Sequence, residues 1–554
     1  MDNSTLSKKA DNLLTVSSNI KKIFQIIYQE QNKEKDDEDE IPKIIVSELV
    51  SKMAFYYEKI RNSVDYEEEH LLRKNAIKRI LKRQIVIEGA VTIKKTDNYN
   101  VAKHLLVELI RAAYLPNNSI PENRIDEISR ILERYLKLKE YSLRKLAKYE
   151  IKERNNFSNW IVALMASDIE EKFSNNPVNS AVIADMHEIL VNNINLPDDS
   201  KYKKDKEIQI YIGIYRNFLK FDKDMLNFLL FKYYNINWDK FSDDEIKKVA
   251  DNILFLRARI EKQINHPLTF QIDKIISRYT VFFKILIDVI AENPVKVYEE
   301  LKKNPNFFER KIKNVCNKKY SISRKKLWRA AIRSIIYIFI TKSVIAFILE
   351  IPVSKFFKQE ISLYSLIINI SFPAVLLFLI VLFFRLPSDN NTNKIIQGVE
   401  EIVFEEKKRK KPFYFLKHAK RSRLLNSIFG IIYFISFFLS FSIVVWGLNK
   451  IGFNWISIII FLFFFTLVSF FSVRIRKNAK ELVVIPAKEN ILSFIAEFFY
   501  IPIISTGKWL SNKFSQINVF VFILDFIIEA PFKVFVSITE EWTKYVKERK
   551  DEII

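Results

Sequence analysis

The sequence is poor in the residues that most often build catalytic and nucleotide-binding motifs. Its 554 residues include 7 glycines, 5 histidines and 1 cysteine. The single cysteine, Cys316, excludes an intramolecular disulfide and a paired-cysteine metal or redox motif. With so few glycines, the chain can form few of the glycine-rich loops whose backbone amides bind phosphates. The nearest approach to a P-loop fails because Pro502 replaces its first glycine and Trp509 replaces its hydroxyl residue.

The histidines form no recognisable site either. His70, His104, His187, His266 and His418 are scattered singly, without the spacing of zinc ligands. The sequence also contains no nucleophile-elbow, kinase or dinucleotide-binding string. It therefore predicts no catalytic residue, no metal site and no cofactor, and an enzyme is the least favoured class of function.

Charge is scarce in one part of the chain and abundant in the other. Up to about residue 325, charged and apolar residues are mixed as in a water-exposed protein, whereas from Leu327 onward long stretches carry almost no charge. The net charge is +23. An AT-rich coding sequence, rich in Lys, Asn, Ile and Phe, explains this excess as well as a functional reason does, but it does not explain why the basic residues cluster between apolar segments.

The water-exposed part is predicted to be a tail followed by a helical domain. Residues 1–41 end in an acidic run, which is typical of a solvated linker. In residues 42–325 apolar residues recur every three or four positions, as at Ile125, Ile128 and Ile131. Turns rich in Pro and Asn separate these stretches, so we expect an all-α cytoplasmic domain of roughly ten helices.

The apolar part contains four stretches that are long enough to span a membrane. They lie at 331–349, 361–384, 424–448 and 455–473. We expect them to form a four-helix transmembrane bundle within residues 326–480. The first stretch is the least typical of a span, because Lys342 lies near its middle.

The basic residues indicate the orientation of these spans. They cluster at 324–333, 407–423 and 474–480. The intervening connections, Glu350–Glu360 and Asn449–Phe453, are short and poor in net charge. Because basic loops stay in the cytoplasm, the helical domain, the loop at 385–423 and the C-terminus are all predicted to be cytoplasmic. The sequence thus predicts a multi-pass protein of the cytoplasmic membrane.

The loop at 385–423 combines cations with aromatic residues beside a span. Its candidates for contact with anionic lipid headgroups are Lys407, Lys408, Arg409, Lys410, Lys411, Lys417, Lys420, Arg421 and Arg423. Each such cation contributes about 1 kcal/mol near an anionic leaflet. An orientation signal with no further role is the alternative interpretation, and nucleic acid is the least favoured partner.

The C-terminal region, 481–554, is predicted to hold re-entrant or interfacial helices. The segment at 491–505 is apolar but short for a span, and it contains Glu497 and Pro502. Further along, on a helix through 517–538, Asp525, Glu529 and Lys533 share one face.

Three arrangements of the segment at 517–538 remain open. It is an interfacial amphipathic helix, a span whose acids pack in the bundle near Lys342, or a helix folded onto the cytoplasmic domain. If both C-terminal segments crossed the membrane, the protein would have six spans and its C-terminus would still be cytoplasmic.

A resemblance to other proteins rests on four segments: Ile208–Lys220, Leu229–Trp238, Gly507–Leu510 and Asn518–Lys533. These segments resemble an uncharacterised family of multi-pass membrane proteins from small-genome, candidate-phylum bacteria. The resemblance covers about a fifth of the chain and implies a membrane location without an activity, so it supplies no site residue.

Two classes of function follow from these observations. The first is a membrane-anchored scaffold or interaction protein, whose helical domain binds a protein partner. The second is a transporter or channel component that uses Lys342, Asp525 and Glu529 as intramembrane polar groups. Whether these three residues meet inside the bundle separates the two classes.

Overall fold

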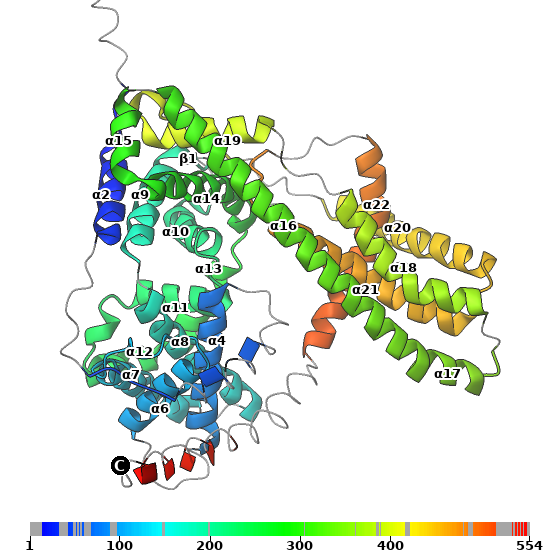
Figure 1. Cartoon of the computed structure of the whole chain (residues 1–554), viewed down its shortest axis with the longest axis horizontal. Coiled ribbons are helices and arrows are strands. Elements are labelled where there is room, and N and C mark those ends of the chain that lie inside the picture. The colour runs from blue at the N-terminus through cyan, green and yellow to red at the C-terminus, as the bar shows by residue number, and fades with distance from the viewer. Residues whose placement is uncertain are drawn as a thin grey trace, which may run out of the picture. The chain divides into compact units, whose positions relative to one another are not determined.

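The computed structural model describes residues 14–32, 42–47, 68–88, 97–146, 150–174, 176–197, 200–303, 305–359, 362–383, 389–415, 422–479, 481–485 and 491–516, with isolated positions at 51–59, 387 and 535–550. The chain forms two compact units (Figure 1). The helical unit comprises residues 18–280, 410–415 and 520–554, and the bundle unit comprises 1–17, 281–409 and 416–519. Both units are built almost entirely of helices, which confirms the all-α fold class.

The helical unit contains a long series of short and medium helices. They are α2 (Ser18–Gln31), α4 (Glu69–Lys82) with the π-turn η2 (Arg83–Glu88), α6 (Asn98–Arg111), α7 (Arg124–Lys145), α8 (Ile151–Ser174), α9 (Pro177–Asn193), η4 (Lys203–Asp205), α10 (Lys206–Asn217), α11 (Lys223–Tyr234), η5 (Trp238–Lys240), α12 (Asp243–Asp251), α13 (Ile253–Ile264) and the start of α14 (Thr269–Glu292). Two two-residue strands, β1 (Ile194–Asn195) and β2 (Phe413–Tyr414), pair in parallel.

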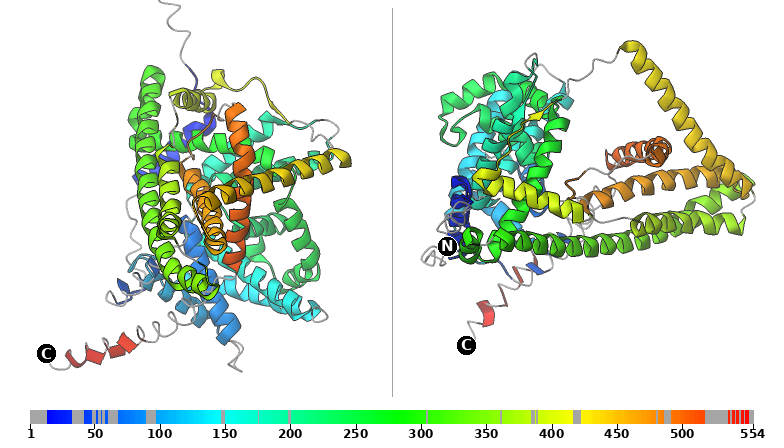
Figure 2. Two further views of the ribbon diagram at one scale, coloured as in Figure 1. Left: turned by 90° about the vertical axis from the view of Figure 1, so that its right-hand side faces the viewer. Right: turned by 90° about the horizontal axis from the view of Figure 1, so that it is seen from above.

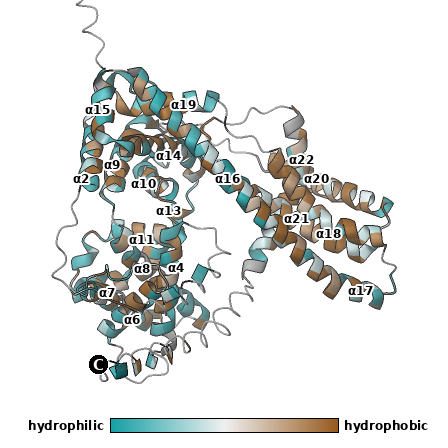
Figure 3. Cartoon of the chain, viewed as in Figure 1, coloured by the Kyte–Doolittle hydropathy of each residue, from teal (hydrophilic) through white to brown (hydrophobic). Residues whose placement is uncertain are grey.

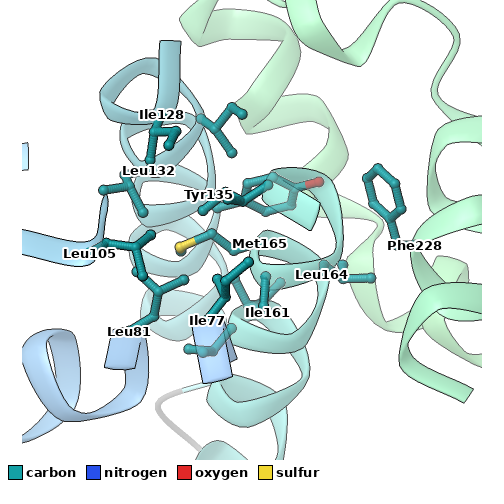
Figure 4. Close-up of a cluster of buried hydrophobic side chains, with 14 of the residues drawn as sticks. Ile77, Leu81, Leu105, Ile128, Leu132, Tyr135, Ile161, Leu164, Met165 and Phe228 are labelled. Carbon is teal, nitrogen blue, oxygen red and sulfur yellow. The ribbon is translucent and has the colours of Figure 1, made fainter. Parts of the chain in front are cut away.

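The core of the helical unit forms where the apolar stripes of its helices meet. Ile77 of α4, Leu105 of α6, Leu132 of α7 and Met165 of α8 are buried in one cluster (Figure 4). Burial of such side chains is the main source of stability for helices of this length. The apolar stripes that the three-to-four-residue periodicity predicts along helices, as at Ile125, Ile128 and Ile131, are buried in this core.

This core contains a buried carboxyl group. Asp168 on α8 is fully buried, and among the described residues neither of its oxygens has a hydrogen bond of normal geometry. Burial raises the pKa of Asp168 to about 7, with a smaller contribution from Asp239. The hydroxyl of Tyr135, buried on α7, is its polar neighbour.

Stability of the protein should therefore fall as the pH rises through neutrality. Folded Asp168 keeps its proton where the unfolded chain, with an ordinary carboxyl pKa, has lost it. The free energy of unfolding should drop by about 1.4 kcal/mol between about pH 6 and about pH 8. Asp168→Asn should remove this component of the slope, as measured by thermal unfolding of the whole protein at both pH values. An unchanged difference between the two pH values in Asp168→Asn would contradict the assignment.

The bundle unit contains the long apolar helices. After the end of α14 come α15 (Pro294–Lys303), α16 (Pro305–Ile345), the π-turn η6 (Ala346–Glu350), α17 (Ile351–Phe356), α18 (Leu363–Leu382), α19 (Asp389–Val403), η7 (Glu405–Lys407), α20 (Arg423–Lys450), α21 (Trp455–Ala479) and α22 (Ile491–Gln516).

Four helices in the described residues are long and apolar enough to cross a membrane. They are Asn306–Phe356, Leu363–Leu382, Leu424–Lys450 and Trp455–Arg476. Their hydrophobic surfaces stand out in Figure 3, whereas the first half of α16 is hydrophilic. The four predicted spans are thus confirmed as helices of suitable length and composition.

The first of these helices is much longer than the sequence predicted. It runs through α16, η6 and α17 without a break, so Glu350 lies inside the helix. The expected loop from Glu350 to Glu360 was therefore wrong up to Phe356. Apolar residues continue past Glu350 at Ile351 and Val353, which explains why the helix does not end at the charge.

The predicted basic loop also contains a helix. α19 buries Ile395, Val399 and Ile402, a helical spacing that was overlooked among the nearby charges. Gly398 is required on this face, since a Cβ there would lie 2.2 Å from the ring of Phe282. Among the described residues after α19, the short turn η7 and the two-residue strand β2 are the regular elements before α20 begins.

The C-terminal apolar segment forms one helix rather than a short piece. α22 has 26 residues and continues through Pro502. A proline leaves the carbonyl four residues earlier without its helical donor. Here that carbonyl belongs to Phe498, and Ser436 on α20 donates a hydrogen bond to it at 2.6 Å. In the right-hand view of Figure 2, α22 is seen end-on while α21 lies across the view, so the two helices cross steeply.

Gly507 marks the crossing of α21 and α22. A Cβ built at Gly507 would lie 2.1 Å from the carbonyl oxygen of Thr466. Gly507→Leu should therefore force the helices apart and lower the free energy of unfolding by about 1 to 3 kcal/mol. Gly430→Leu is the matched control, because nothing lies within 4 Å of a Cβ at Gly430. Equal thermal unfolding of the two variants in detergent would argue against a close crossing.

Candidate functional site

A cluster of polar side chains lies inside the apolar bundle. Its members are Lys342 on α16, Glu350 in η6, Ser354 on α17, Asn369 on α18 and Ser457 on α21, and each has 0% of its surface exposed. Burial of a charge at membrane depth costs about 2.5 to 3.5 kcal/mol by insertion scales. Polar groups that remain in such a place usually line a substrate or ion pathway. We call these five residues the polar cluster.

Glu350 is the centre of the polar cluster. Its Oε1 accepts hydrogen bonds from Asn369 Nδ2 at 2.6 Å and from Ser457 Oγ at 2.7 Å. Asn369 Nδ2 also reaches the carbonyl oxygen of Ser457 at 3.4 Å. One carboxylate oxygen therefore joins three helices of the bundle.

Pro352 explains how Glu350 reaches the same face as Lys342. Residues eight apart on a regular α-helix point about 80° away from each other. The π-turn η6 adds one residue to its turn and rotates Glu350 back, to within about 20° of Lys342. This turn lies directly before Pro352, whose ring would clash with the carbonyl four residues earlier in a regular helix. π-Turns of this kind are frequent at functional sites.

Several polar atoms of the cluster have no hydrogen-bond partner among the described residues. They are Lys342 Nζ, Glu350 Oε2, Ser354 Oγ and Asn369 Oδ1. Lys342 Nζ lies 4.2 Å from the centroid of the Phe464 ring, and its ammonium interacts electrostatically with Glu350. Pro373 additionally removes the helical donor of the Asn369 carbonyl. Around Glu350 the polar cluster therefore contains acceptor atoms that receive no hydrogen bond from the described helices.

The polar cluster lies toward one end of the bundle. At that end, which we call the turn end, Phe356 closes α17, and Phe357 stacks edge-on against Trp455, the first residue of α21. The opposite half is apolar: Leu327, Ala331, Leu377, Val381 and Val468 are buried together there. We call this second group the apolar seal.

The structure answers part of the prediction about intramembrane charges. Lys342 is buried inside the bundle as the transporter hypothesis requires. Asp525, Glu529 and Lys533 lie outside the described residues, so the arrangement in which Asp525 and Glu529 meet Lys342 stays a prediction. In the structure Lys342 instead interacts electrostatically with Glu350, to which Asn369 donates a hydrogen bond. The sequence prediction placed Glu350 in a loop and therefore missed it as a site residue. The nearby Pro352 is the signal that could have indicated an altered helical turn at this point.

The candidate lipid-binding cations are only partly free in the structure. Lys407 pairs with Glu400 at 2.9 Å, Arg409 with Glu401 at 3.0 Å, and Lys408 with Glu405. Of the other candidates, Lys410 and Lys411 are exposed, Lys417, Lys420 and Arg421 lie outside the described residues, and the side chain of Arg423 is not described. Ion pairing by the preceding glutamates was not foreseen, and it reduces the charge available to a lipid surface.

A pocket of about 630 Å³ lies beside His266 in the helical unit. His266 Nδ1 accepts a hydrogen bond from the Leu268 amide, and its Nε2 lies 3.4 Å from Asp205 Oδ2. Burial lowers the pKa of His266, which keeps the ring neutral. The ring thus serves to join the start of α14 to η4, as expected of a lone histidine. Among the described residues no three His, Cys, Asp or Glu side chains gather as metal ligands.

Comparison with known proteins adds no assignment to this geometry. The family resemblance noted from the sequence therefore stays a prediction, and the polar cluster is interpreted from its own chemistry. No protein-family model, curated protein or solved structure matches the chain.

Proposed function

We propose that this chain is a multi-pass protein of the cytoplasmic membrane and that its bundle is a transporter or channel component. The polar cluster is the site at which the bundle binds a proton or a small monovalent cation. The observation that carries this proposal is Glu350 Oε2, which is buried in the π-turn η6, has no hydrogen-bond partner among the described residues and belongs to a carboxylate that interacts electrostatically with Lys342. A purely structural carboxylate would be expected to use both oxygens.

The proposed orientation rests on the charges that flank the spans. Arg324, Arg329 and Arg333 precede the apolar half of α16, and Arg474 and Arg476 close the span of α21. Basic residues favour the cytoplasmic side, so we place the turn end outside the cytoplasm. The N- and C-termini are then both cytoplasmic in the proposed topology.

We also propose that α22 is an interfacial helix on the cytoplasmic side. Its steep crossing of α21 supports this position (Figure 2), and Tyr500 of α22 contacts Ser472 and Arg476, in the half of α21 that ends at Arg476. Trp509 and Lys508 are exposed on α22, which suits contact with lipid headgroups.

Reconstituted protein tests the transport proposal directly. Liposomes containing the full chain, with indicators of pH, Na⁺ and K⁺ trapped inside, should show faster movement of at least one of these ions than empty liposomes. Glu350→Gln should abolish the difference. Glu497→Gln is the matched control, because Glu497 is exposed on α22 and lies outside the polar cluster. Equal rates for Glu350→Gln and the unmodified protein would refute the proposal.

A membrane-anchored interaction protein is the second candidate, favoured by a different observation. The helical unit exposes large apolar side chains, among them Ile151, Ile236 and Phe255. Such side chains, where contiguous, mark binding surfaces for other proteins. Photocrosslinking from position 255 in intact cells should then give a discrete product that Phe255→Asp removes. Crosslinking from the exposed position Glu207 serves as the comparison.

A further inference from the structure

We infer that the ion bound at Glu350 is the proton, and that it reaches Glu350 only from the turn end of the bundle. This inference rests on the proposed function and deepens it. It is carried by three features of the bundle: the free oxygen of Glu350, the polar residues on one side of it, and the apolar seal on the other.

The chemistry of the polar cluster suits a proton better than a metal cation. Asn369 and Ser457 both donate to Glu350 Oε1, so Oε2 is the atom left for a new bond. Only Ser354 Oγ and Asn369 Oδ1 join it as unpartnered side-chain oxygens in the described part of the bundle. A dehydrated monovalent cation such as K⁺ needs a ring of oxygens that replaces its hydration shell, whereas a proton needs one oxygen.

The binding step is a simple transfer from water. A hydronium ion gives its proton to Glu350 Oε2, one O–H bond breaks in hydronium and one forms on the carboxyl group, and a water molecule is released. Lys342 is the charged group that faces Glu350 from α16, while Asn369 of α18 and Ser457 of α21 are neutral. The pair of Lys342 and Glu350 changes from no net charge to one positive charge.

A ladder of polar residues connects Glu350 to the turn end. Ser354 lies one helical turn beyond Glu350, close to the end of α17. Ser365 lies one turn before Asn369, close to the start of α18. Both serines are buried in the bundle. Each of the two helices thus presents a hydroxyl between Glu350 and the aqueous end of the bundle.

The apolar seal closes the opposite direction. In the cluster that α16, α18 and α21 form beyond Lys342, the packed side chains are hydrocarbon, and Leu377 and Val381 are buried with Ala331 and Val468. The buried Ser469 and Ser472 of α21 lie on its α22 side, where the Tyr500 hydroxyl contacts Ser472 Oγ and the Ser469 carbonyl. Hydrocarbon side chains offer no hydrogen bonds along which a proton moves. A proton bound at Glu350 therefore returns to the turn end unless the helices move.

Ion flux distinguishes failure of this inference from failure of the proposed function. In the liposomes described above, acidification of the interior should depend on Glu350 while Na⁺ and K⁺ movements should not. Movement of Na⁺ or K⁺ that depends on Glu350, without a proton flux, would overturn the inference and leave the proposed function standing. No ion flux that depends on Glu350 would overturn both.

Cysteine labelling tests the one-sided access. In a Cys316→Ala background, Ser354→Cys and Ser365→Cys should react with a membrane-impermeant maleimide added outside the cytoplasm. Val381→Cys, in the apolar seal, should stay unreacted from either side, and Cys316→Ala alone gives the background. Thermal unfolding of each variant identifies any that misfolds. If one serine variant misfolds, the other still tests the access from the turn end. Labelling of Val381→Cys at the rate of the serine variants, or labelling of the serine variants only from the cytoplasm, would overturn the inference.

Discussion

Replacing Lys342 with methionine should destabilise the bundle by about 3 to 5 kcal/mol, because removal of one partner leaves the other charge buried without compensation. Glu350 has 0% of its surface exposed, and Lys342 is the charged group that interacts with it. Methionine preserves the length and the apolar stem of the lysine, so lost packing contributes little. The measurement is thermal or denaturant unfolding of the purified protein in detergent.

The double variant separates charge from packing. If the destabilisation comes from an unpaired charge, Lys342→Met with Glu350→Leu should be closer in stability to the unmodified protein than Lys342→Met alone. Lys355→Met on α17 is the matched control, since Lys355 is exposed and its loss should change the free energy of unfolding by less than about 0.5 kcal/mol. A double variant whose loss equals the sum of the two single losses would show that Lys342 and Glu350 do not interact.

The same comparison bears on function. A bundle that retains its fold but loses Glu350-dependent flux in the double variant would show that the charges serve the ion rather than the structure. Burying the charges of the polar cluster costs stability. If the cluster is kept for ion binding despite this cost, the double variant should be more stable than the unmodified protein and show no flux. If Lys342 and Glu350 serve only to hold the helices together, the double variant should show the same flux as the unmodified protein.

The sequence predicted the helices and the spans because these depend on local patterns. Periodic apolar residues determined the core of the helical unit, as at Ile125, Ile128 and Ile131 on α7. Runs without charge determined the four apolar helices, since only length and composition decide whether a helix can span. Each of these predictions required information from one segment at a time.

The polar cluster depends on contacts between segments and on one local irregularity. Asn369 and Ser457 lie 19 and 107 residues from Glu350, and nothing near Glu350 in the chain indicates that they donate to it. A regular helix would also have turned Glu350 away from Lys342, and the π-turn before Pro352 reverses this. Lys342 alone could be identified, because a charge inside an apolar run is visible without the fold.

The continuation of α22 through Pro502 has a similar cause. A proline with nearby Glu497 predicts an interruption, since the helix loses one internal hydrogen bond. The hydroxyl of Ser436 satisfies the freed carbonyl of Phe498 from another helix. Such compensation from a residue 62 positions away cannot be read from the segment itself.

Asn391 should be the residue outside the spans whose loss most disturbs the bundle unit. Its side-chain amide makes four hydrogen bonds: Nδ2 donates to Tyr320 Oη at 3.0 Å and to the Leu482 carbonyl at 2.8 Å, and Oδ1 accepts from the amides of Val484 at 2.8 Å and Ile485 at 3.2 Å. Every donor and acceptor of the amide is therefore in use.

These bonds join three parts of the chain near the first turn of α19. Tyr320 belongs to the hydrophilic half of α16, and residues 481–485 connect α21 toward α22. Without Asn391, the amides of Val484 and Ile485 lose the side-chain oxygen that accepts their hydrogen bonds, and the bond from Val484 is a buried one. The geometry of α22 relative to α21 thus depends partly on a residue that lies in neither helix.

Asn391→Leu should lower the free energy of unfolding by about 3 kcal/mol or more, because each buried polar group left without a partner costs about 1 to 3 kcal/mol. Amide hydrogen exchange at Val484 and Ile485 should accelerate in the variant, and proteases should cleave the 481–485 segment sooner. Asn390→Leu is the matched control, since the neighbouring Asn390 is exposed. If the two leucine variants exchanged and unfolded alike, the hydrogen bonds of Asn391 would not hold the connection, and the position of α22 would have to come from its own contacts, chiefly the close approach of Gly507 to α21.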